Sequence, residues 1–91
     1  MGETGDECIK ATFLYHLRRK RAIGEKHVPY DTLKRGFPIH LGKDIKKTAD
    51  ELIRRGIITT KPASYGLQVS LNKERLGEIE QIIRRVLGHI F

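Results

Sequence analysis

The residues with the clearest chemical potential are the basic side chains of one segment, residues 43–54. At about 100° per residue, a helix places Lys43, Lys47 and Arg54 along one line, with Lys46 toward one side. Lysine and arginine can pair with phosphate oxygens or donate to O6 and N7 of guanine. The pattern therefore favours a polyanionic partner, and the alternative is a charged face that contacts only solvent.

Two acidic residues, Asp50 and Glu51, flank this line of charge and would repel phosphates. They point about 100° apart on a helix, so shared acid–base chemistry between them is not expected. We expect the N-terminal half of the segment to make the main contacts with any polyanion. The acids are expected to pair with basic neighbours three or four positions away, namely Lys46, Lys47, Arg54 or Arg55.

The element that must position these side chains is a helix from about Gly42 or Lys43 to Arg55. Gly56 ends this helix where a left-handed residue is favoured, and residues 57–60 have the composition of a β-strand. The apolar face of the helix has the spacing i, i+4, i+7 and i+8 and consists of Ile45, Ala49, Leu52 and Ile53.

This passage from helix through glycine to strand resembles the point at which the recognition helix meets the wing in winged helix-turn-helix domains. The resemblance is to small archaeal-type DNA-binding proteins and covers roughly residues 9–71. It implies an α+β fold with a three-helix core, a β-hairpin wing and an additional C-terminal helix. Residues 1–91 would then form one domain, with the winged-helix core at 7–71 and the last helix at 72–91. The sequence departs from the family pattern in its short second helix, the proline of its turn and the acids of its recognition helix.

The first predicted helix runs from about Glu7 to Arg19 or Lys20, and Asp6 is expected to cap it. A loop around Gly24 follows, and residues 27–28 are expected to form a short first strand. The face of the helix that we expect to be buried consists of Ile9, Phe13, Leu14 and Leu17.

Pro29 is expected to begin a second helix over residues 30–35, with Leu33 directed inward. Residues 36–38 end it, because their proline disfavours a helical conformation at the residue before it. Three apolar residues of the turn that follows are expected to enter the core, namely Phe37, Ile39 and Leu41.

Two strands, 57–61 and 67–71, are predicted to form the hairpin, joined by a five-residue loop at 62–66. Asn72 is expected to cap a last helix from Lys73 to about Ile90. That helix repeats apolar residues with alternating spacings of three and four, which is typical of a coiled-coil seam. Either the seam packs on the first helix, or it forms a homodimer interface through Leu76, Ile79, Ile83, Val86 and Ile90.

Further basic residues are candidates for nucleic-acid contact. The resemblance implies that the wing would use Lys61 and Tyr65, and that the second helix would place its basic residues across the phosphates. The basic residues of the second helix are Lys34 and Arg35. The densest basic run lies at the end of the first helix, where the alternative is a solvated helix end; it consists of Arg18, Arg19, Lys20 and Arg21.

The composition agrees with a polyanionic partner, because the formal net charge is +7 and residues 10–61 contain 14 Lys and Arg against 5 Asp and Glu. A single cysteine, Cys8, allows no intramolecular disulfide and favours a reducing, cytoplasmic location. No membrane span or signal peptide is expected. The spacing of the four histidines predicts no metal site, and no catalytic constellation or cofactor-binding motif is legible, so no enzyme is predicted.

The sequence therefore predicts a protein that binds double-stranded DNA, as a transcription regulator or a chromatin-associated factor. One alternative is an RNA-binding or ribosome-associated module, for which the same basic surface would serve. The other is a protein-interaction module, in which the apolar stripe of the last helix would be the functional surface.

Overall fold

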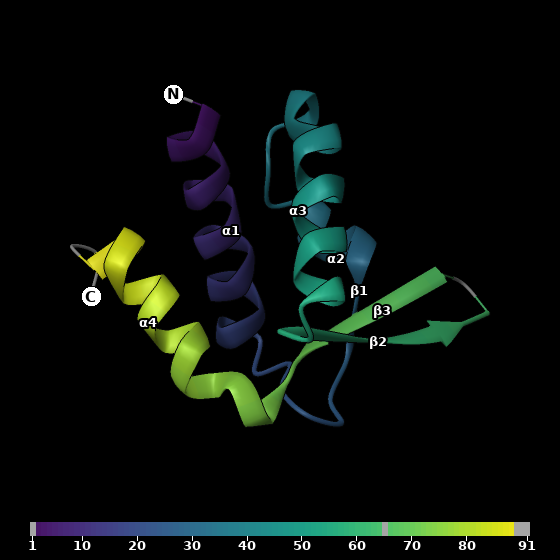
Figure 1. The fold of residues 1–91 in the computed structure, drawn as a ribbon. Coiled ribbons are helices and arrows are strands. Elements are labelled where there is room, and N and C mark those ends of the chain that lie inside the picture. Colours follow the sequence, from purple (N-terminus) through teal and green to yellow (C-terminus); the bar gives the residue numbers. More distant parts are fainter. Residues whose placement is uncertain (1, 65, 89–91) are drawn as a thin grey trace.

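The computed structural model describes residues 2–64 and 66–88, with side chains from Glu7 onward. This part of the chain is α+β, as predicted, with α-helices and a three-stranded antiparallel sheet (Figure 1). The elements in chain order are α1 (Gly2–Arg19), β1 (Val28–Pro29), α2 (Tyr30–Lys34), the 3₁₀ turn η1 (Ile39–Leu41), α3 (Gly42–Arg54), β2 (Ile58–Ala63), β3 (Gly66–Leu71), the 3₁₀ turn η2 (Lys73–Arg75) and α4 (Leu76–Leu87).

Helix α1 begins earlier than the sequence pattern predicted, at Gly2, so Asp6 lies inside the helix and does not precede it. The acidic composition of residues 3–7 suits the N-terminal turns of a helix, where negative charge is favoured. The predicted buried face is confirmed for Phe13, Leu14 and Leu17, while Ile9 is partly buried against the core.

The two long helices α1 and α3 end in the same way. After α3, the Ile57 N–H donates to the Leu52 carbonyl and the Gly56 N–H donates to the Ile53 carbonyl, each at 3.0 Å. This Schellman motif requires a left-handed residue, and Gly56 has a φ of 77°, as predicted. After α1, Arg21 occupies the corresponding position with a φ of 56°, which is costlier for a residue with a Cβ.

The sheet has the order β1-β3-β2, so β3 is central. Strands β2 and β3 pair from Ile58 with Leu71 as far as Ala63 with Gly66. The predicted five-residue loop is therefore wrong, since only residues 64 and 65 separate the two strands. Pro62 is accommodated within the pairing because β2 is an edge strand. The outer part of β2 is exposed, and the hairpin extends away from the helices (Figure 1).

The turn between α2 and α3 corrects one predicted core residue. Phe37 and Leu41 pack partly buried against the core, but the side chain of Ile39 is 98% exposed. The physical reason is the 3₁₀ turn: with three residues per turn, its side chains project in three directions about 120° apart. Only Leu41 of η1 can therefore reach the core, and Ile39 points into solvent.

Helix α4 lies along α1 and closes the core on that side (Figure 1). Its residues Ile79 and Ile83 are fully buried in the chain itself, and Ile82 is also buried, with 7% of its surface exposed. This burial corresponds to the first alternative, in which the seam packs on the first helix, and the homodimer interface stays a prediction. Leu76 and Val86 are partly buried on the same core, and Ile90 lies outside the described residues. The exposed residues of α4 in its described part are glycine, glutamate, glutamine and arginine.

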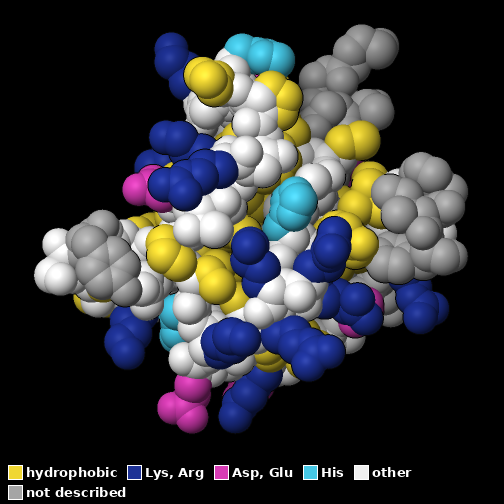
Figure 2. Space-filling model, turned by 180° about the vertical axis from the view of Figure 1, so that it is seen from behind, with side chains coloured by type: hydrophobic (Ala, Val, Ile, Leu, Met, Phe, Trp, Pro, Cys, Tyr) yellow, Lys and Arg dark blue, Asp and Glu magenta, His cyan; other side chains and the backbone are white. Residues whose placement is uncertain are grey.

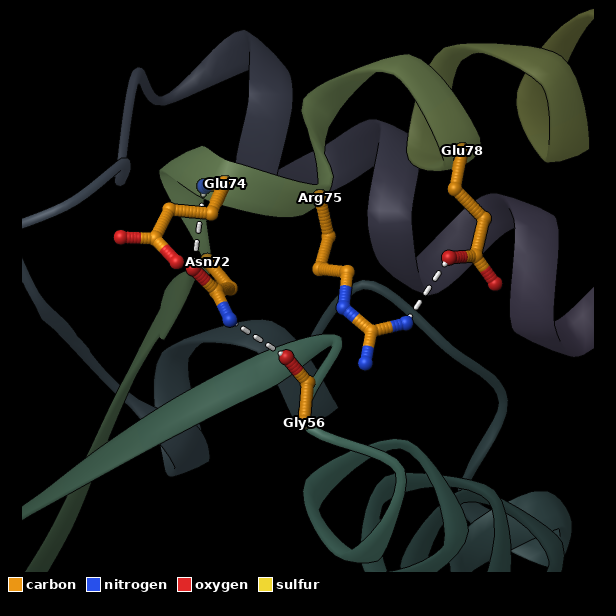
Figure 3. Close-up of polar contacts among 5 residues, drawn as sticks. All are labelled: Gly56, Asn72, Glu74, Arg75 and Glu78. Carbon is orange, nitrogen blue, oxygen red and sulfur yellow. Dashed lines mark hydrogen bonds and ion pairs between the residues drawn. The ribbon is translucent and has the colours of Figure 1, made fainter.

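Asn72 joins the end of α3 to the start of the last helix (Figure 3). Its Nδ2 donates to the Gly56 carbonyl oxygen at 2.7 Å, and its Oδ1 accepts from the Glu74 N–H at 3.0 Å. The predicted cap is thus confirmed, although the first turn that it caps is the 3₁₀ turn η2. Arg75 then pairs with Glu78 one turn later, at 3.0 Å.

We expect the substitution Asn72→Ala to lower the free energy of unfolding by about 1–2 kcal/mol, since it removes a helix cap and leaves the Gly56 carbonyl without its donor. Urea denaturation followed by circular dichroism measures this change. Asn72→Ser is the matched variant, because its hydroxyl keeps an N-cap acceptor for the Glu74 N–H and adds no charge beside the Gly56 carbonyl, so its loss should be smaller. An unchanged unfolding midpoint in Asn72→Ala would contradict this role.

Candidate nucleic-acid interface

The basic face of α3 follows from how the helix is anchored. Four residues of α3 are buried on one side, namely Ile45, Thr48, Ala49 and Leu52. The opposite side is exposed, as predicted, and it presents Lys43, Lys46, Lys47 and Arg54. These four residues line one shallow hollow of about 460 Å³ together with Gly42 and Asp50. The sequence spacing thus identified side chains that share one surface.

Acidic residues modify this basic face. Lys46 Nζ contacts both carboxylate oxygens of Asp50, at 2.9 and 3.1 Å, so the predicted local pairing is confirmed for this pair. The hydrogen bond to Asp50 and the charge of its carboxylate raise the pKa of Lys46. Within the described part of the chain, Lys43, Lys47 and Arg54 form no salt bridge. Their charges are therefore the ones most available to an anion.

A second hollow continues along the helix, with a volume of about 550 Å³. It is lined by Lys47, Glu51, Arg54 and Arg55. Lys47 and Arg54 border both hollows, so the exposed surface is continuous over the length of α3. At about 1.5 Å per residue, this surface is roughly 20 Å long.

The residues of α2 lie beside the N-terminal end of that surface. Lys34 and Arg35 are exposed and line a hollow of about 360 Å³ with Phe37, Pro38, Ile39 and Gly42. Gly42 borders this hollow and the first hollow of α3, so the structure brings the basic residues of α2 next to those of α3. Ile39, which the sequence pattern had assigned to the core, belongs to this exposed region. Figure 2 shows that Lys and Arg side chains are spread over the back of the molecule, with few acidic side chains among them.

The hairpin contributes less charge. Lys61 is exposed on β2, opposite Gln68 of β3, and it is the one basic residue in the sequence of residues 58–71. Tyr65, the other residue predicted to contact nucleic acid here, lies outside the described residues. The hairpin also exposes one large hydrophobic side chain in its described part, that of Leu67 on β3, which is 43% exposed.

The basic run at the end of α1 does not form one patch. Arg18 is hydrogen-bonded to Glu80 of α4, and the guanidinium of Arg19 lies 6.0 Å from the centre of the Tyr15 ring. Lys20 and Arg21 are exposed. The run also lies at the end of the molecule where α3 terminates, whereas Lys43 is at the opposite end of α3 (Figure 1). The structure therefore separates this run from the leading end of α3.

Sequence patterns did not single out two residues that shape this region, Tyr30 and His16. The Tyr30 hydroxyl is buried without a hydrogen-bond partner among the described residues, and burial raises the pKa of Tyr30. His16 of α1 packs edge-on against Phe37, with ring centroids 5.7 Å apart. It also lies against Gly36, where an added Cβ would be 3.3 Å from His16 Nε2. His16 thus fixes the turn before α3 to the first helix.

Burial, together with the positive charges of Lys20 and Arg19, lowers the pKa of His16 from its ordinary value of 6.5. The folded chain therefore favours neutral imidazole, and its contribution to stability is present above about pH 6.5 and lost as the pH falls through the lowered value. We expect the free energy of unfolding to decrease between pH 7 and pH 5, and the variant His16→Gln to show a weaker decrease. Equal pH dependence in both proteins would contradict this assignment.

The described residues contain no group of three His, Cys, Asp or Glu side chains arranged to hold a metal ion. None of the helices in the described ranges is sufficiently long and apolar to cross a membrane. Comparison of the chain with protein-family models, curated proteins and solved structures finds no match.

Proposed function

We propose that this chain is a winged helix-turn-helix domain that binds double-stranded DNA through the exposed face of α3. The observation that supports this proposal most directly is the alignment of Lys43, Lys47 and Arg54 on one exposed surface, without salt bridges among the described residues. A binding protein of this kind, and not an enzyme, would act as a transcription regulator or a chromatin-associated factor.

The order of the elements supports the proposal. A helix, a short strand, two helices, a β-hairpin and a final helix follow one another in the arrangement that winged helix-turn-helix domains use. Helix α2 and helix α3 are joined by a turn, so α3 would be the recognition helix and the hairpin the wing. An α-helix with its side chains is about 10–12 Å wide, which matches the width of the major groove of B-DNA.

The charges beside α3 support the same orientation. If α3 entered the major groove with its N-terminal end first, Lys34 and Arg35, at the C-terminal end of α2, would lie next to the phosphate backbone. Asp50 lines the same hollow as the basic residues of α3, but its carboxylate is paired with Lys46, which offsets its negative charge toward a phosphate. The proposal therefore assigns five contacts, made by Lys34, Arg35, Lys43, Lys47 and Arg54.

Fluorescence anisotropy of labelled random duplex DNA, with a hairpin RNA of the same length, tests the proposal. Four to five phosphate contacts predict that affinity falls on the order of 10²–10³-fold between about 50 and 200 mM salt. Absence of duplex binding at 50 mM salt would sink the proposal. Tighter binding to the RNA hairpin in direct competition would instead indicate the RNA-binding alternative, because the major groove of duplex RNA is too narrow for a helix.

A further inference from the structure

Ile39 is a large hydrophobic side chain whose exposure to solvent is not explained by packing within the fold. It is 98% exposed, whereas the other exposed large hydrophobic residue in the described part of the chain, Leu67, is 43% exposed. Isolated hydrophobic side chains are common on protein surfaces. What distinguishes Ile39 is its place, because it directly precedes the N-terminal end of the basic face of α3.

The backbone around Ile39 is well defined. The Phe37 N–H donates to the Lys34 carbonyl at 3.1 Å, and the Leu41 N–H donates to the Pro38 carbonyl at 3.0 Å. Proline fixes φ at position 38, and a β-branched side chain such as isoleucine has few rotamers. Ile39 is therefore presented to solvent in a restricted orientation, and contact with a partner would cost little conformational entropy.

The surroundings of Ile39 combine an apolar floor with basic residues. Phe37, Pro38 and Ile39 line the hollow of about 360 Å³ together with Lys34 and Arg35. On its other side Gly42 opens toward Lys43 and Lys46, and a Cβ added at Gly42 would meet no atom within 4 Å. A single apolar side chain bracketed by cations is too small for a protein docking patch, which would bury several hundred Å² per partner.

We propose that Ile39 contacts the C5-methyl group of thymine and gives the protein a preference for an A·T pair where α3 enters the major groove. This inference rests on the proposed DNA-binding function. The thymine methyl is the apolar group that bases present in the major groove, so it is the group that an exposed isoleucine can recognise there. The neighbouring cations would hold the phosphates on either side and direct Ile39 toward the base edges.

The test begins with selection of preferred sites from a random duplex pool, followed by replacement of single thymines by deoxyuridine, which removes only the methyl group. For the wild type, one such replacement should weaken binding about threefold to fivefold, as expected for one buried methyl group. Ile39→Ala should be insensitive to deoxyuridine at that position and should bind the selected site about threefold to fivefold more weakly than the wild type, with an unchanged salt dependence. Leu67→Ala, at the other exposed hydrophobic residue, is the matched control and should retain the sensitivity.

The outcomes separate this inference from the function on which it rests. If the wild type does not bind duplex DNA at low salt, the proposed function fails. If it binds but no sequence is enriched, or no single deoxyuridine weakens it, the inference alone is overturned. The same conclusion follows if Ile39→Ala keeps the wild-type sensitivity to deoxyuridine.

Discussion

Changing Lys43 and Lys47 together to glutamate should lower the affinity for duplex DNA by at least about 100-fold at 50 mM salt. Each phosphate contact contributes roughly tenfold at this salt concentration through counterion release, and two contacts are lost. The slope of log affinity against log salt should also become shallower by about 2. Both lysines are exposed and form no salt bridge within the described ranges, so circular dichroism should show an unchanged fold.

The matched control reverses two lysines that lie away from α3, Lys26 and Lys73, and thus changes the net charge equally. Both residues are exposed, in the loop after α1 and in η2 respectively. Their replacement by glutamate should weaken binding far less, because neither lies on the proposed interface. Equal losses in the two double variants would show that only net charge matters, and would remove the face of α3 from the account.

The largest expected effect on stability is that of Ile83→Ala, which should lower the free energy of unfolding by about 2–5 kcal/mol. Ile83 is fully buried where α4 covers α1, so its truncation leaves a cavity in the chain's own core. For a domain of this size the loss corresponds to a decrease in Tm of more than about 10 °C. Thermal denaturation monitored by circular dichroism measures it, with Gln81→Ala on the exposed side of α4 as a control that should change little.

Analytical ultracentrifugation of Ile83→Ala distinguishes the two roles considered for α4, which are packing in the core of one chain and forming a homodimer interface. If Ile83 belongs to the core of one chain, the wild type and Ile83→Ala should have the same mass over a wide concentration range, and the Tm of the wild type should not depend on concentration. A variant that kept its Tm but changed from dimer to monomer would contradict the placement of Ile83 in the core. It would restore the interface expected from the seam of α4.

The parts of the fold that the sequence predicted are those with local causes. The apolar spacing of α3 and the glycine at position 56 specify the helix, its end and its exposed face, because neighbours within a few residues determine all three. The same is true of Asn72, whose side chain caps the next turn. The exposure of Lys43 and Arg54 follows because the buried residues of α3 lie two, five and six positions away from each, on the opposite side of the helix.

The predictions that were wrong, or that the sequence left open, depend on geometry that the residue type does not reveal. Ile39 was expected in the core because it is apolar, but the 3₁₀ turn has room for only one inward side chain. The seam of α4 is equally apolar in a core and in a dimer interface, so periodicity cannot choose between them. The four residues of the run at 18–21 are all basic in sequence. In the structure Arg18 is hydrogen-bonded to Glu80 of α4, which is distant along the chain.

Binding of DNA by α3 is tested most directly by titration of the isotope-labelled protein with a short duplex, followed through backbone amide chemical shifts. If α3 is the DNA-binding face, the largest shifts should occur at the N-terminal half of α3 and the turn before it, residues 39–47, with smaller shifts at Lys34 and Arg35. Shifts concentrated on α4, or none at low salt, would contradict the assignment of α3 as the DNA-binding face.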